Sequence, residues 1–141
     1  MSRNSEQMAA ELAELNYETA PFRAPNDQGG ADGVRFEYRI QDGSRVGETV
    51  TLGLALHPNE GEWPEVAPHW LYLSPPDDVL AEQVRGSRQR GVVRPYEGED
   101  GLAWMAISAP PRDFWDAIEP PDTKSMKTYL TRHIRRIWRV R

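Results

Sequence analysis

Residues 34 to 57 alternate between apolar and polar side chains, and this pattern constrains the fold more than any other feature of the chain. Within 34–41 every even position is apolar and every odd position is polar, and the alternation returns within 48–57. The apolar face comprises Val34, Phe36, Tyr38, Ile40, Val50, Leu52, Leu54 and Leu56. A two-residue period is typical of a strand with one buried face, and Asp42-Gly43-Ser44-Arg45 supplies a turn between the segments. The pattern therefore predicts an antiparallel hairpin.

The neighbouring segments predict a helix before this hairpin and a strand after it. Residues 5–15 predict a helix with Ser5 as its N-cap. Its apolar face would contain Met8, Leu12 and Leu15. Residues 16–25 are expected to form a short edge strand limited by prolines, and residues 69–73 a further strand of the same meander.

The C-terminal half predicts loops and then the strongest helix of the chain. We expect a short helix after Asp77-Asp78, a loop over 85–100, an apolar segment at 101–107 and one helical turn in 113–118. A final helix begins at Asp122 or Thr123 and carries an apolar stripe opposite its basic residues. The stripe comprises Met126, Tyr129, Leu130, His133, Ile134, Ile137 and Trp138. The whole pattern predicts a single α+β domain over 1–141, with an antiparallel meander of about four strands and helices against one side.

The chain contains no cysteine, which excludes disulfides, thiolate metal sites and thiol nucleophiles together. Its three histidines, His57, His69 and His133, are separated by 12 and 64 residues and form none of the short patterns typical of metal sites. There is no glycine-rich phosphate loop either. We therefore expect neither a metal nor a cofactor.

The net charge of −5 conceals an asymmetry along the chain. Residues 124–141 hold seven basic residues and no acid, whereas residues 1–123 hold 10 basic and 22 acidic residues. The basic helix is therefore expected to dock on the acidic body or to face an acidic protein partner. Nucleic acid and membrane partners are not expected, because most of the surface would repel phosphates. We find no apolar span and no secretory signal, so cytoplasmic localisation is expected.

Two candidate motifs have ordinary structural interpretations when judged from the residues alone. Ser108 lies in Ala106-Ile107-Ser108-Ala109-Pro110, which lacks the Gly-x-Ser-x-Gly elbow of many hydrolases, so a structural role is favoured over a nucleophilic one. His57-Pro58-Asn59 is interpreted as a turn, because Pro and Asn are common turn formers. The five tryptophans are expected in the core, and an exposed one would mark an interface.

The order of these elements resembles the ubiquitin-conjugating (E2, or UBC-like) superfamily, especially its divergent bacterial members. The turn Glu62-Trp63-Pro64-Glu65-Val66-Ala67-Pro68 is similar to the family's Tyr-Pro-x-x-x-Pro between two strands of the meander. Gly101-Leu102-Ala103-Trp104 stands where the family has its Gly-x-x-Cys active-site strand, and Phe114-Trp115 and a helix follow as in the family. The family also has a His-Pro-Asn triplet, but His57-Pro58-Asn59 precedes the proline-rich turn instead of following it.

The resemblance implies a UBC-like fold and a role in a bacterial ubiquitin-like conjugation pathway. By this resemblance Trp104 matches the position of the catalytic Cys, and the chain has no cysteine elsewhere, so thioester transfer is impossible. We prefer a non-catalytic module that binds an E1-like (ThiF-type) activating enzyme, a ubiquitin-like protein, or both. The alternative is a transferase that carries the ubiquitin-like protein as an oxyester on Ser108, with His57 or His69 as the base if the fold brings one close. A third hypothesis, outside the family, is an unrelated small protein-interaction module.

Overall fold

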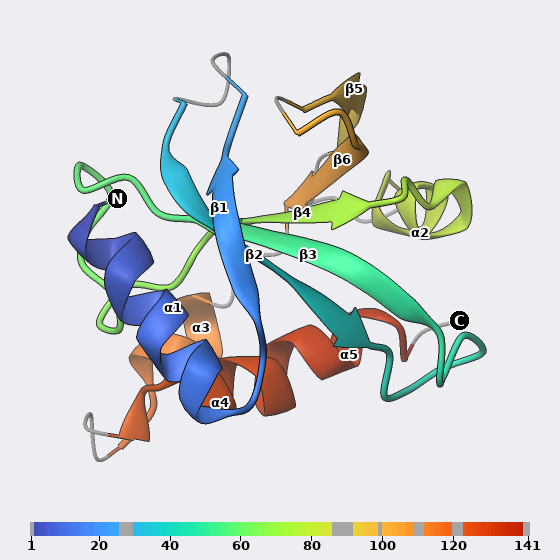
Figure 1. Ribbon diagram of the computed structural model, residues 1–141. Helices are drawn as coiled ribbons and strands as arrows, with labels where there is room; N and C mark the ends of the chain where they lie inside the picture. Colours follow the sequence, from blue (N-terminus) through green and yellow to red (C-terminus); the bar gives the residue numbers. More distant parts are fainter. Residues whose placement is uncertain are drawn as a thin grey trace.

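Six antiparallel strands form one curled sheet in the computed structural model, which describes residues 2–25, 30–85, 92–98, 100–108, 112–119 and 123–139. The strands lie in the order β1-β2-β3-β4-β6-β5 (Figure 1). Their bounds are Thr19–Arg23 (β1), Asp32–Arg39 (β2), Thr49–Ala55 (β3), Trp70–Ser74 (β4), Val92–Glu97 (β5) and Ala103–Ser108 (β6). The α+β class is therefore confirmed.

The β2–β3 hairpin confirms the prediction made from the alternating pattern. Val34 lies opposite Leu54, and Phe36 lies opposite Leu52. These four side chains are at most 2% exposed, because their shared face is covered by helices. The alternation thus arises from a strand pair with one face in the core.

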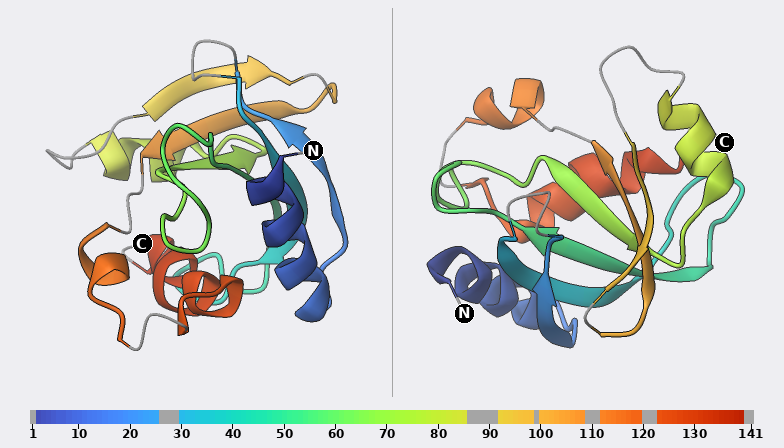
Figure 2. Two further views of the ribbon diagram at one scale, coloured as in Figure 1. Left: turned by 90° about the vertical axis from the view of Figure 1, so that its left-hand side faces the viewer. Right: turned by 90° about the horizontal axis from the view of Figure 1, so that it is seen from above.

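Two helical segments cover this face of the sheet. One is α1 (Arg3–Glu14), and the other runs through α4 (Met126–Tyr129), the π-helical turn η3 (Leu130–Ile134) and α5 (Arg135–Ile137). The left view of Figure 2 shows both on the same side of the strands. Two shorter helices, α2 (Asp78–Arg85) and α3 (Arg112–Asp116), follow β4 and β6.

The helix caps are set by side chains that accept backbone N–H groups. Ser2, not Ser5, is the N-cap of α1 and accepts from the Ser5 N–H. Asp77 accepts from the Leu80 N–H at 3.0 Å, as expected for the start of α2. Ser125, not Thr123, is the N-cap of α4. The alternative cap Asp122 lies outside the described residues.

The main core lies between the helices and the covered face of the sheet. The apolar stripe predicted for the last helix is buried as expected, from Met126 to Trp138. Met8 and Leu12 of α1 are also fully buried. Each of these side chains contributes on the order of 1.5–3 kcal/mol through removal of apolar surface from water.

A smaller cluster occupies the opposite face, where the sheet curls. It comprises Phe22, Ala24, Tyr72, Trp104 and Ala106. The rings of Phe22 on β1 and Trp104 on β6 lie 4.8 Å apart although three strands separate β1 from β6. The right view of Figure 2 shows β5 and β6 crossing over the other strands. The curl therefore brings the two ends of the sheet together.

The expected number of strands was wrong, because the sheet has six and not about four. β5 falls within 85–100, the stretch expected to be a loop. Its pairing with β6 shifts register between Val93 and Tyr96, a stretch that contains Pro95. An edge strand tolerates both features, since only one of its sides pairs with a neighbour. The sequence of β5 therefore lacks the regular alternation of apolar and polar residues that would predict a strand.

No helix in the described part of the chain combines the length and apolarity needed to cross a bilayer.

Candidate functional site

Ser108 and His69 lie within hydrogen-bond distance. The Oγ of Ser108 is 2.7 Å from Nε2 of His69. Ser108 ends β6 and lies opposite Trp70 of β4, so antiparallel pairing brings the preceding residue His69 beside the hydroxyl. When Nε2 is unprotonated it accepts from the Ser108 hydroxyl, and this is the arrangement in which a histidine activates a serine.

The Ser108 side chain is buried, with the residue 5% exposed. It shares a face of β6 with Trp104 and Ala106, because side chains alternate along a strand. An acyl group could reach this hydroxyl only if the surroundings of the β6 end opened. The pair therefore combines a reactive geometry with restricted access.

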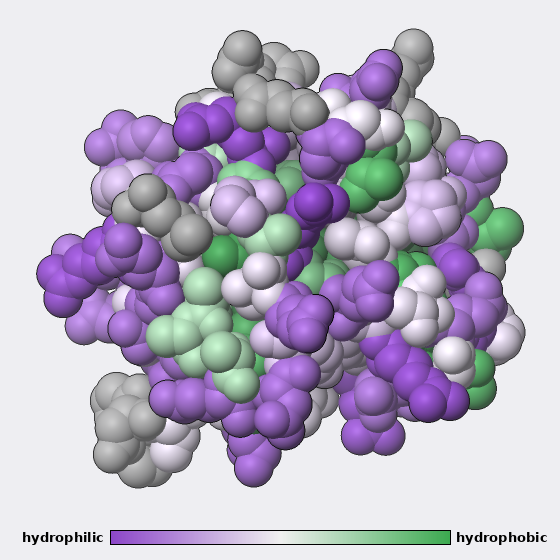
Figure 3. Space-filling view, viewed as in Figure 1, coloured by the Kyte–Doolittle hydropathy of each residue, from purple (hydrophilic) through white to green (hydrophobic). Residues whose placement is uncertain are grey.

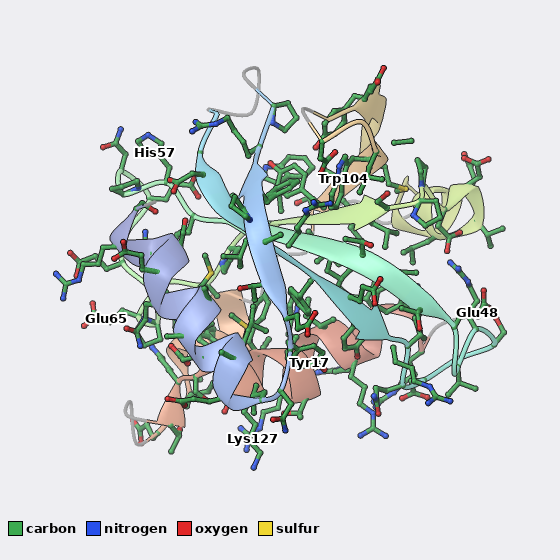
Figure 4. The ribbon with its side chains drawn as sticks, in the orientation of Figure 1. Tyr17, Glu48, His57, Glu65, Trp104 and Lys127 are labelled. Atoms are coloured by element: carbon green, nitrogen blue, oxygen red, sulfur yellow. The ribbon has the colours of Figure 1, made fainter. Side chains whose placement is uncertain are left out.

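His57 does not take the role of base that was considered for it. Its Nδ1 accepts the backbone N–H of Asn59 at 3.0 Å, and its carbonyl accepts the N–H of Glu60. His57-Pro58-Asn59 is therefore a turn after β3, as the residue types predicted. Figure 4 shows His57 at the upper left of the molecule, apart from the labelled Trp104 near the upper centre.

Trp104 is fully buried on β6. Its ring packs on Phe22, and its indole nitrogen donates to Oδ1 of Asp100 at 3.1 Å. Asp100 also lies 3.5 Å from Arg35, which links the β5–β6 turn to β2. Trp104 is thus a structural residue that joins the ends of the curled sheet. Four of the five tryptophans are buried, and Trp70 is partly exposed.

The basic face of the C-terminal helix pairs only in part with the acidic body. Nε of Arg139 lies 2.8 Å from Oδ2 of Asp42, and Nε of Arg135 lies 3.9 Å from the same oxygen. The Arg139 guanidinium, as a hydrogen-bond donor, holds the pKa of Asp42 below its usual range. Lys127, Arg132 and Arg136 are exposed. Arg141, the last basic residue, lies outside the described residues.

A groove that no sequence motif indicated lies between the end of α1, the end of β2 and the C-terminal helix. Its volume is about 280 Å³. Its lining residues are Leu15, Tyr17, Tyr38, Gln41, Lys127, Leu130, Thr131 and Arg135. They come from three distant segments of the chain, so no local pattern could reveal them. Figure 4 shows Tyr17 and Lys127 on the same lower side of the molecule.

Among the described residues, no group of three His, Asp or Glu side chains is placed to hold a metal ion. No family model, curated protein or solved structure matches the chain.

Proposed function

We propose that the protein is an E2-like component of a bacterial ubiquitin-like conjugation pathway, binding an E1-like activating enzyme, a ubiquitin-like protein or both. The observation that carries this proposal is Trp104. By the resemblance it matches the position of the family's Cys, and it is fully buried against Phe22. A residue committed to packing supports a binding role in place of thioester transfer.

The order of elements also supports a UBC-like fold as part of the proposal. A helix precedes four consecutive antiparallel strands, β1 to β4, and the Trp63-Pro64 turn lies between β3 and β4. Trp63 is buried against Trp115, whose indole donates to the Pro64 carbonyl at 2.8 Å. The β5–β6 hairpin replaces the irregular active-site segment of the family and is the main departure.

The binding hypothesis is tested with an E1-like enzyme and a ubiquitin-like protein encoded near the gene of this chain. Each is mixed with the full chain, and complex formation is measured by isothermal titration calorimetry, with and without ATP. Binding of either protein without a covalent adduct is the expected result. If neither protein binds, the pathway assignment is wrong and an unrelated interaction module is favoured.

The second candidate, oxyester transfer, is favoured by the 2.7 Å contact between Ser108 and His69. In this mechanism the Ser108 oxygen attacks the thioester carbonyl of the ubiquitin-like protein on its E1-like carrier. The C–O bond forms as the C–S bond breaks. His69 takes the hydroxyl proton and returns it to the departing thiolate. The buried hydroxyl must become exposed before this step.

The two candidates differ in the adduct they predict. Oxyester transfer gives a base-labile, thiol-insensitive adduct that is lost in Ser108→Ala and retained in Ser74→Ala. Ser74 is a suitable control because it is also a buried serine at a strand end. His69→Gln would slow the adduct's formation while leaving complex formation intact. An adduct that survives Ser108→Ala would contradict the serine mechanism.

A further inference from the structure

The groove beside the C-terminal helix combines apolar walls with cationic and hydroxyl groups. Leu15 and Leu130 supply apolar surface, and Lys127 and Arg135 lie on the helical wall. The rings of Tyr17 and Tyr38 each pack against an aromatic ring of the core. Tyr17 meets Phe36 edge-on at 5.2 Å, and Tyr38 stacks on Trp138 at 5.8 Å. The positions of both tyrosine rings are therefore fixed by the core.

The hydroxyl of Tyr38 is the unusual feature of this groove. Tyr38 is 2% exposed, and its hydroxyl has no hydrogen-bond partner in the part of the chain that the structure describes. The hydroxyl oxygen is itself buried, so a ligand reaches it only when neighbouring side chains of the groove move aside. A buried unpaired hydroxyl costs on the order of 1–3 kcal/mol, and a ligand that then accepts from it recovers this energy. Burial raises the pKa of Tyr38 to about 12, so the group remains a neutral donor near pH 7.

The charged groups around the groove favour an anionic acceptor. Lys127 is exposed and forms no ion pair within the described ranges. Among the described residues, the ion pair of Arg135 is the distant contact of 3.9 Å with Asp42. Gln41 lines the same groove, and none of the described lining residues is an acid. In Figure 3 the lower margin, where this helix runs, is mainly hydrophilic.

We propose that this groove binds one carboxylate of a protein partner, with a neighbouring apolar side chain of that partner against Leu15 and Leu130. The carboxylate accepts from the Tyr38 hydroxyl and lies near Lys127 and Arg135. The inference does not depend on the proposed pathway.

The size of the groove favours a single anchoring residue of a protein. Pockets for drug-sized ligands have volumes of roughly 300–1,000 Å³. At about 280 Å³ and open to solvent along the helix, this groove holds one or two side chains. The exposed Arg132 and Arg136 continue the basic surface beyond it, as complementarity to an acidic protein requires. The carboxylate can be a chain terminus or an acidic side chain.

The test is an NMR titration of the full ¹⁵N-labelled chain with three organic probes and inorganic phosphate. N-acetyl-leucine presents a terminal carboxylate beside an apolar group. The acetylated, amidated dipeptide of leucine and glutamate presents a side-chain carboxylate. N-acetyl-leucinamide lacks the charge. Binding of one carboxylate probe, with the largest shifts at the groove residues, is expected, and the preferred probe identifies the source. The uncharged amide should bind at least tenfold more weakly.

Three variants assign the binding to the groove. Tyr38→Phe removes only the hydroxyl and keeps the ring on Trp138, so the chain should remain folded and bind the carboxylate about tenfold more weakly. Lys127→Gln should weaken binding about two- to threefold, as an exposed charge does. Arg132→Gln is the matched control, because Arg132 is exposed on the same helix but does not line the groove.

Four results would overturn the proposal. They are no binding of either carboxylate probe, equal binding of the uncharged amide, unchanged affinity in folded Tyr38→Phe, and tighter binding of phosphate than of both carboxylates.

Discussion

Glu11 accepts a hydrogen bond from the indole nitrogen of Trp63 at 2.7 Å. The other oxygen of the same carboxylate accepts the backbone N–H of Met126 at 2.8 Å. Three segments distant in the sequence are thereby joined: α1, the turn between β3 and β4, and the start of α4. A surface-type residue on an amphipathic helix thus acts as an internal link.

Glu11→Ala should destabilise the fold by about 2–4 kcal/mol, because two charge-assisted hydrogen bonds are lost and two donors are left unpaired. Urea denaturation followed by tryptophan fluorescence measures the change in the free energy of unfolding. Glu14→Ala is the control, since Glu14 is exposed on the same helix. Equal effects of the two substitutions would show that the Glu11 contacts do not contribute.

Asn4→Ala should lower the free energy of unfolding by about 2–4 kcal/mol, because buried backbone groups lose their hydrogen-bond partner. Asn4 is 4% exposed, and its amide nitrogen donates to the carbonyls of Leu56 and Gly61. Its Oδ1 accepts the backbone N–H of Trp63. Hydrogen exchange should also accelerate at Trp63, because its amide loses the acceptor. An unchanged exchange rate at Trp63 in this variant would contradict the assignment.

Gly53→Ala should destabilise the protein by about 1–3 kcal/mol through overpacking. A Cβ at this position would lie 2.9 Å from the ring of Phe22 on the curled face of the sheet. The backbone itself is not the obstacle, since Gly53 lies within β3. The double variant with Phe22→Leu should recover part of the loss, and a double-mutant cycle measures this coupling. Strict additivity would rule out the proposed contact.

Asp32 should make stability fall at acidic pH. Burial acts to raise the pKa of this carboxyl, but hydrogen bonds from Ser2 and Ser5 outweigh it, and the net pKa is lowered. A lowered folded-state pKa contributes stability above the unfolded value of about 3.9, and this contribution is lost as the pH falls through the folded value. Asp32→Asn should therefore be less stable near pH 7 and lose less stability below about pH 4. Chemical denaturation across this pH range is the measurement, and parallel curves for the two proteins would refute the assignment.

Periodic segments could be predicted from the sequence, because their signal is local. The β2–β3 hairpin and the stripe from Met126 to Trp138 were correct, since burial of one face dictates the residue spacing. β5 was missed because an edge strand with a register shift need not alternate. The N-cap of α1 is Ser2 and not the predicted Ser5, because the Ser5 side chain is buried and donates to the carbonyl of Asp32.

The candidate sites were harder to predict from the sequence than the hairpin, because tertiary contacts build both of them. His69 was one of two histidines considered for Ser108, and only the pairing of Trp70 with Ser108 brings it close. The groove draws on residues near positions 15, 40 and 130, and its distinctive group is a tyrosine hydroxyl. A tyrosine in an alternating strand is predicted as core, and nothing local indicates that its hydroxyl lacks a partner.

The strand order has a consequence for how the chain folds. Each pair of neighbouring strands is consecutive in sequence except β4 and β6, which pair across α2 and β5. The connections within the β1–β4 meander and within the β5–β6 hairpin are shorter than the segment between β4 and β6, so joining the two units carries the larger entropic cost. We expect the hairpin to dock last. Because Ser108 meets His69 only where β4 pairs with β6, this contact would report the completion of folding. A chain arrested just before that step would leave Tyr72 packed on Phe22 but without Trp104 and Ala106.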